Sequence, residues 1–183
     1  MATDSLSQPG RRSPTAEQLR VWRDFIEATT ILQSESGVRL QKESGLSSGD
    51  YGVLLALSEA ESKRMRSSEL AAGVGWERSR LSHHLGRMEG RGLIRREECV
   101  TDSRGAEVVL TPEGADAFRR ASAPHLHAIR ELFVDALTPE QLDAAGEIAT
   151  ALRAHLDPQG RRASSAVERS VPFDDHSVKA PSR

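Results

Sequence analysis

The residues of this sequence that are best suited to chemistry lie within residues 76–104, and their types favour binding over catalysis. Hydroxyl, imidazole and guanidinium groups recur along one short segment, in which Trp76 comes first. The donors are Ser79, Arg80, Ser82, His83 and Arg87. Such groups can donate hydrogen bonds to purine N7 and O6 in the major groove of DNA, and arginine also pairs with phosphate. Trp76 could stack on a sugar or pack on the protein.

These side chains share one face of an expected helix from about 76 to 90. At 100° per residue, Leu81, Leu85 and Met88 fall within about 60° of one another and face the core, and the donors project from the opposite side. Residues in the N-terminal half would reach bases, and Arg87 would meet phosphate. A solvated amphipathic helix would show the same pattern, so the helix alone leaves both interpretations open.

The elements around this helix are typical of a winged helix-turn-helix. A short helix capped by Ser67 or Ser68 and a glycine turn at 73–75 precede it. After Gly92 the apolar period changes to two, which predicts strands at 93–100 and 106–110 joined by a polar loop.

Arg104 lies at the tip of that loop. It could insert into a minor groove, where the negative potential attracts arginine, and Asp102 could orient it by a charge-assisted hydrogen bond. The alternative is a plain hairpin turn with surface charges.

Charge is concentrated in the same region. Residues 63–105 carry ten lysines and arginines against six acids, a net charge of +4. Because the whole chain has a net charge of −2, the remainder carries −6. A basic island in an acidic chain suggests one anionic partner docked at one place.

The remaining elements are helices with clear start signals. Thr15 begins a capping box and a long helix over 15–43, and Ser47 begins another that ends near Glu59. Thr111, followed by proline, caps a helix in which Pro124 predicts a kink or a break, and Thr138 starts the last helix. Residues 1–14 and 158–183 have the composition of a disordered arm and tail.

The chain resembles the MarR-type winged-helix regulators. The resemblance covers about 15–157. Its most specific part is the wing and following cap, D-x-R-G-x-x-V-x-L-T-x-x-G, which matches residues 102–114. The softer part is the helix and strand over 70–96. The implied fold is mainly α (α+β): a winged helix-turn-helix lobe at about 50–111, with dimerisation helices at 15–43 and 112–157.

The resemblance implies a homodimer that binds a palindromic operator, with half-sites about 34–36 Å apart. It implies that Arg104 enters the minor groove supported by Asp102, and that the α-helical donors meet the operator. It also implies a repressor, rather than an activator, that is released by a small aromatic or lipophilic ligand between the first, second and fifth helices. The candidate ligand residues are Trp22, Phe25, Ile26, Tyr51 and His125.

Other classes of function find little support in the sequence. The single cysteine, Cys99, excludes a cysteine-rich metal site and fits a small packed side chain in a wing strand. No phosphate loop, nucleophile elbow or metal-ligand spacing occurs, so we expect no enzyme, metal or cofactor. No apolar run approaches the roughly 18 residues of a membrane span, which favours a cytoplasmic protein. The alternative function is a winged-helix dimer that binds a protein or a ligand without binding DNA.

Overall fold

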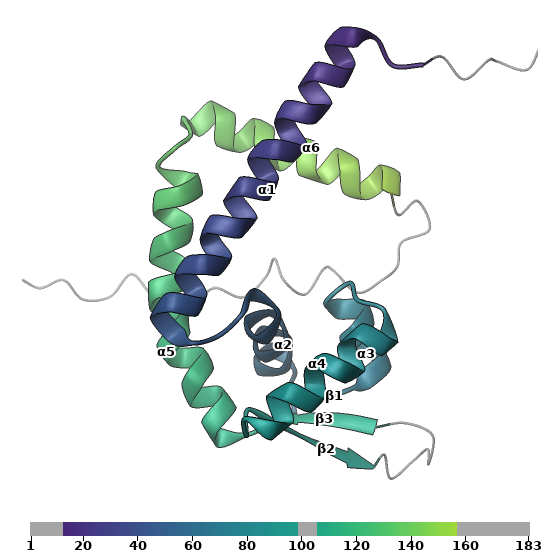
Figure 1. The fold of residues 1–183 in the computed structure, drawn as a ribbon, viewed down its shortest axis with the longest axis vertical. Coiled ribbons are helices and arrows are strands. Elements are labelled where there is room, and N and C mark those ends of the chain that lie inside the picture. The colour runs from purple at the N-terminus through teal and green to yellow at the C-terminus, as the bar shows by residue number, and fades with distance from the viewer. Residues whose placement is uncertain (1–12, 99–105, 157–183) are drawn as a thin grey trace, which may run out of the picture.

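The computed structural model describes residues 13–98 and 106–156, and helices make up most of them (Figure 1). The elements, in chain order, are α1 (Ala16–Ser44), α2 (Ser48–Glu59), β1 (Arg64–Arg66), α3 (Ser67–Gly73), α4 (Arg78–Gly90), β2 (Ile94–Glu98), β3 (Ala106–Leu110), α5 (Pro112–Ile129), the π-helical turn η1 (Arg130–Val134) and α6 (Pro139–Leu156). Helices with a small antiparallel sheet confirm the expected fold class.

The helix starts follow from local capping. Thr15 Oγ1 accepts from the amide of Gln18, whose side chain accepts from the Thr15 amide, and α1 ends at Gly45 with a φ of 69°. Ser47 forms the same reciprocal pair with Asp50 at the start of α2. Because these signals act within three residues, the sequence locates both boundaries well.

Two predicted boundaries were wrong. The N-cap of α3 is Arg66, because the hydroxyl of Ser67 donates instead to the carbonyl of Ala106 on β3, at 2.9 Å. Helix α4 begins at Arg78 and not at Trp76, since the turn extends through Glu77, the N-cap. At α3 a tertiary contact takes the side chain that was predicted to cap the helix. At α4 the turn takes the first residues that were predicted to be helical.

Helix α5 continues through Pro124 without the break that the sequence left open. A π-helical turn, η1, widens the helix further along, after Ile129. A π-helical turn inserts one extra residue into the helical ladder and re-aims the side chains that follow.

The sheet has the order β1-β3-β2, with β3 antiparallel to both neighbours. Arg64 pairs with Val109 across β1 and β3, and Ile94 pairs with Leu110 across β2 and β3. Strand β2 ends at Glu98 and β3 begins at Ala106, so the two paired strands flank the predicted wing loop in the sequence.

The core lies in the lobe formed by α2, α3, α4 and the sheet, and α1 packs against α5 beside it (Figure 1). By contrast, the N-terminal half of α1 and the whole of α6 bury no residue within this chain. Trp22 is 59% exposed and Phe25 43% exposed. These two helices therefore carry an apolar surface that the single chain leaves uncovered.

Within residues 13–98 and 106–156 no helix combines the length and the apolar character needed to cross a bilayer. The same residues contain no group of three metal-ligating side chains.

Candidate nucleic-acid interface

Helix α4 is amphipathic in the sense that the sequence predicts. Leu81, Leu85 and Met88 are buried in the core of the lobe. The side chains of this helix that are predicted to contact DNA are exposed: Ser79, Arg80, Ser82, His83 and Arg87. The structure thus brings these five onto one solvent-facing surface, and their contact with DNA stays a prediction.

A tight turn sets the direction of α4 relative to α3. Gly75 adopts a φ of 68°, a left-handed conformation that favours glycine. The amide of Trp76 donates to the carbonyl of Ala71 at 2.9 Å, which closes the turn onto α3. The backbone of the turn therefore contributes to setting the direction of α4 relative to α3, independently of the side chains of α4.

Trp76 packs on the lobe. A Cβ atom at Gly49 would lie 2.6 Å from its ring, so α2 approaches the indole at a position where only glycine leaves room. The guanidinium carbon of Arg80 lies 4.5 Å from the indole centroid, a cation–π contact that orients one predicted base-reading residue.

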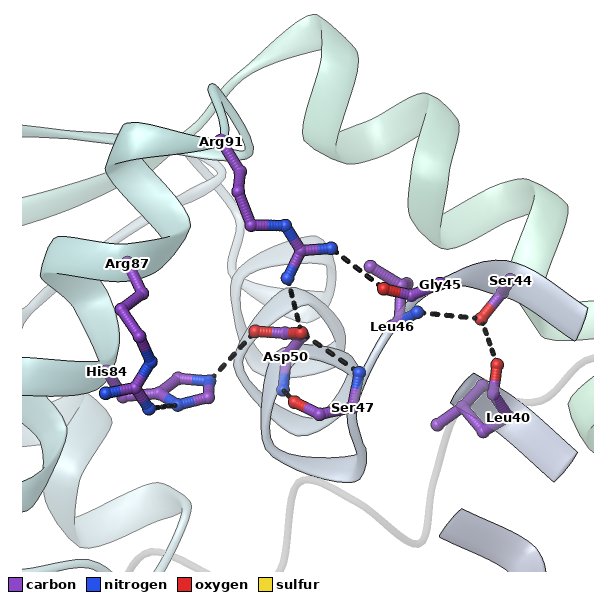
Figure 2. A network of polar contacts seen from close by, with 9 residues as sticks. All are labelled: Leu40, Ser44, Gly45, Leu46, Ser47, Asp50, His84, Arg87 and Arg91. Carbon is purple, nitrogen blue, oxygen red and sulfur yellow. Dashed lines mark hydrogen bonds and ion pairs between the residues drawn. The ribbon is translucent and has the colours of Figure 1, made fainter. Parts of the chain in front are cut away.

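A polar network joins α4 to α2 beneath the exposed face (Figure 2). His84 Nε2 lies 3.0 Å from Asp50 Oδ1, and Arg91 Nη1 donates to Asp50 Oδ2 at 2.8 Å. His84 Nδ1 lies 2.9 Å from Arg87 Nη2. The second amino group of Arg91 donates to the carbonyl of Gly45, just beyond α1. The Asp50 carboxylate, together with Arg91, therefore links the end of α1, the start of α2 and helix α4.

The surroundings decide the charges in this network. Burial raises the pKa of Asp50, but hydrogen bonds from Ser47 and Arg91 outweigh that effect and leave the pKa lowered. Burial lowers the pKa of His84; the Asp50 carboxylate opposes this, and the positive charges of Arg87 and Arg80 add to it. At neutral pH the structure thus holds an ionised Asp50 beside a neutral His84.

Sequence reasoning missed this network. Asp50 is explained locally as a capping-box residue, and its partners lie far along the chain. The available signal was its type, because glutamate or glutamine usually occupies that position of a capping box.

Ion pairs neutralise several arginines of the basic island at residues 63–105, but in the part of the chain that the structure describes they do not neutralise the arginines within α4. Arg64 lies near both Glu97 and Glu107, and Arg96 pairs with Glu89 at 2.6 Å. Arg95 pairs with Glu97, and Arg91 with Asp50. Among the residues that the structure describes, no carboxylate pairs with Arg78, Arg80 or Arg87 of α4. Arg80 and Arg87, which are predicted to meet DNA, are therefore among the arginines of the described residues without a carboxylate partner, whereas Lys63 of the same island bonds to the carbonyl of Ser58. Asp102, Arg104 and Cys99 lie outside the described residues.

The five candidate ligand residues fall into two places. The rings of Tyr51 and His125 pack with centroids 4.4 Å apart and planes inclined at 58°, and both line a cavity of about 630 Å³ between α1, α2, α5 and η1. Trp22 and Phe25 line a separate groove with Ile148 and Leu152 of α6, and Ile26 is exposed. The cavity walls that sequence reasoning missed are Leu32, Gln33, Ser36, Leu40, Ser48, Ile129, Leu132 and Phe133.

Comparison with known proteins places this arrangement in a family. The model of the MarR family matches residues 44–105, a stretch that contains α2, β1, α3, α4 and β2 and ends before β3. Sco3205, a MarR family transcriptional regulator from Streptomyces coelicolor solved in complex with DNA, is 39% identical, with a TM-score of 0.78 over 85% of this chain and 98% of that chain. The chain belongs to the MarR family.

Two further MarR-type relatives are similar. AbsC, a MarR family transcriptional regulator from Streptomyces coelicolor, is 37% identical, with a TM-score of 0.74 over 81% of this chain and 99% of that chain. The transcriptional repressor MprA of Escherichia coli K12 is 26% identical over 67% of this chain and 69% of its own length. The MarR family consists of transcriptional regulators, so the predicted functional class of the chain is confirmed.

Proposed function

We propose that this MarR-family chain is a homodimeric, sequence-specific binder of double-stranded DNA that represses transcription by occupying a promoter. The observation that carries the proposal is the exposed face of α4, where Arg80 and Arg87 have no carboxylate partner among residues 13–98 and 106–156. An α-helix fits the major groove, and unpaired cations there release counterions from DNA. The DNA complex of Sco3205 and the repressor name of MprA support the same assignment.

The residues divide by the part of DNA they would meet. Ser79, Arg80, Ser82 and His83 lie in the N-terminal half of α4 and would read base edges, whereas Arg87 would hold a phosphate. Asp102 and Arg104 of the wing would act at the minor groove.

The test is fluorescence anisotropy of the protein on labelled DNA from upstream of its own gene, with scrambled competitor, at several salt concentrations. We expect binding that resists the competitor and weakens steeply with salt. Absence of binding even at low salt would contradict the proposal and favour a dimer that binds a protein or a ligand only.

Variants assign the contacts. Arg80→Ala should weaken binding and relax sequence preference, and Arg87→Ala and Arg104→Ala should weaken it, each by about tenfold, because each removes a cation from a groove or a phosphate. Arg130→Ala is the matched control, since it removes the same charge from η1, at the far end of α5 from α4. An equal loss in the control would indicate a general charge effect.

We propose that the functional unit spans 15–157, with the DNA-binding lobe at about 50–111 and dimerisation by the helices at 15–43 and 112–157. The support is the uncovered apolar face of α1 and α6, where Trp22, Phe25, Ile148 and Leu152 line one groove. A second copy of the chain would bury this face, and it would set two α4 helices at the spacing of a palindrome.

We propose that the effector, a small aromatic or lipophilic compound, binds the cavity at Tyr51 and His125. Its walls are mainly apolar, and the Nδ1 atom of His125 is buried without a hydrogen-bond partner in the described part of the chain. A compound with an apolar body and one donor group matches such a lining.

The effector test titrates salicylate-like and lipophilic compounds into the protein–DNA complex. We expect at least one class to release the DNA, and Leu132→Trp, which fills the cavity, to abolish that response. Release that persists unchanged in Leu132→Trp would place the effector elsewhere, and no release by any compound would count against the effector.

A further inference from the structure

Asp50 and His84 are the buried polar side chains of the described residues, and both belong to the network under α4. His84 is 8% exposed and lies on the flank of the Leu81–Leu85–Met88 stripe, where a leucine would pack without polar cost. Its ring also packs against that of Trp76 in a T-shaped arrangement, with centroids 5.0 Å apart. Packing alone therefore does not explain why a histidine is buried at this position of the helix.

The contacts of His84 determine which nitrogen carries the proton. Nε2 lies 3.0 Å from Oδ1 of the ionised Asp50 carboxylate without the alignment of a full hydrogen bond, and the negative charge at that distance favours the hydrogen on Nε2. In the neutral ring Nδ1 is then an acceptor, and the group 2.9 Å away is the guanidinium of Arg87, which can only donate. Asp50 thus fixes the tautomer that lets His84 hold Arg87.

The bond leaves Arg87 available to DNA. One of its five N–H groups is used on His84, and the side chain remains exposed. A long side chain held in one orientation loses less rotamer freedom when it binds phosphate, so the bond pre-organises Arg87.

We propose that His84 and Asp50 are positioning residues for DNA binding: they do not touch DNA, and they hold Arg87 in the orientation in which it meets a phosphate. This inference rests on the proposed DNA-binding function. Its distinctive consequence is that the effects of His84 and Arg87 on affinity are not independent.

A matched pair of substitutions separates the two contacts of the imidazole. In His84→Asn, the side-chain oxygen can take the place of Nδ1 and accept from Arg87. In His84→Gln, the amide nitrogen can take the place of Nε2 and face Asp50, and the acceptor for Arg87 is lost. Anisotropy at fixed salt should show affinity within about twofold of wild type for His84→Asn and a loss of about five- to tenfold for His84→Gln.

The double variant decides the mechanism. If His84 acts through Arg87, His84→Gln should cost no further affinity in the Arg87→Ala background. Losses that multiply, or a His84→Gln variant that binds like wild type, would overturn the inference while leaving the DNA-binding function intact. A wild-type protein that does not bind DNA would overturn both.

A measurement on the wild-type protein tests the inference even if a His84 variant fails to fold. Nitrogen-15 NMR of the His84 ring at neutral pH should show a protonated Nε2 and an unprotonated Nδ1. The Nδ1 signal should shift in Arg87→Ala, which leaves the core of the lobe untouched. A protonated Nδ1 in the wild type would contradict the proposed bond.

Discussion

At the scale of single residues, Asp50 performs two tasks that usually fall to different side chains. It caps α2 through Ser47, and it receives Arg91 and His84 from the end of the helix-turn-helix. With 4% of its surface exposed, the carboxylate depends on these partners to remain ionised.

We therefore expect Arg91→Ala to lower the free energy of unfolding by roughly 2 kcal/mol, measured by urea denaturation. The loss of a charge-assisted bond to a buried carboxylate sets this scale, and it stays below that of a fully buried pair because the Arg91 side chain is 45% exposed. Arg91→Lys should lose less, since it keeps the charge but not the fork to Gly45. Equal stability of Arg91→Ala and wild type would contradict this role.

The histidines predict a pH dependence of stability. The pKa of His84 is lowered by burial, with Asp50 opposing, and burial lowers the pKa of His125. As pH falls below about 6.5, the ordinary histidine pKa, the unfolded chain takes up protons that the folded protein resists. The free energy of unfolding should therefore decrease as pH falls below that value, and level off for each group below its folded pKa.

Urea denaturation at a series of pH values tests this expectation. His84→Gln and His125→Phe should each show a shallower pH dependence than wild type, because each removes one titrating group. Ser82→Ala on the exposed face of α4 should run parallel to wild type. A wild-type curve that is flat between pH 5 and 7 would contradict the expected protonation states.

At the scale of elements, the junction between the wing and α5 depends on Gly114. A Cβ atom at this position would lie 1.9 Å from the carbonyl oxygen of Leu93, which is backbone and cannot rotate away. Thr111 caps α5 there and also donates to the carbonyl of Gly92 at 2.7 Å. The start of α5 is thus packed directly on the backbone that leads into β2.

Gly114→Ala should destabilise the protein by about 3 kcal/mol, at the upper end of overpacking effects, because backbone must move. Gly86→Ala is the control: its Cβ would meet nothing within 4 Å, and alanine favours the helix, so stability should be unchanged or raised by up to about 1 kcal/mol. Thermal unfolding of both variants checks the pair. A Gly114→Ala variant as stable as wild type would contradict the close approach.

At the scale of the whole molecule, the uncovered apolar face of α1 and α6 predicts association. Phe25→Glu should convert a dimer into a monomer in sedimentation velocity, because a carboxylate cannot be buried unpaired in the interface. It should also weaken DNA binding by at least about tenfold, since two linked half-sites become one.

Ser62→Glu is the control for this variant, because it adds the same charge at an exposed site in the turn before β1. We expect it to leave the dimer intact. A wild-type chain that sediments as a monomer would contradict the proposed interface directly.

The sequence alone determined the features that depend on neighbours within a few residues. The caps at Thr15 and Ser47, the buried stripe of α4 and the strands of the wing follow from side-chain type and period, which act over one or two turns. The wing motif and the donors of α4 were sufficient to predict the family.

Tertiary structure alone decided which distant residues meet. Asp50 and Arg91 are separated by 41 positions, so no local pattern could pair them. Packing also placed Tyr51 with His125 in one cavity and Trp22 with Phe25 in a separate groove, a division that their shared aromatic character and helical position do not predict. The physical reason is that helical period fixes the face on which a residue lies, whereas the packing of the whole chain decides what that face touches.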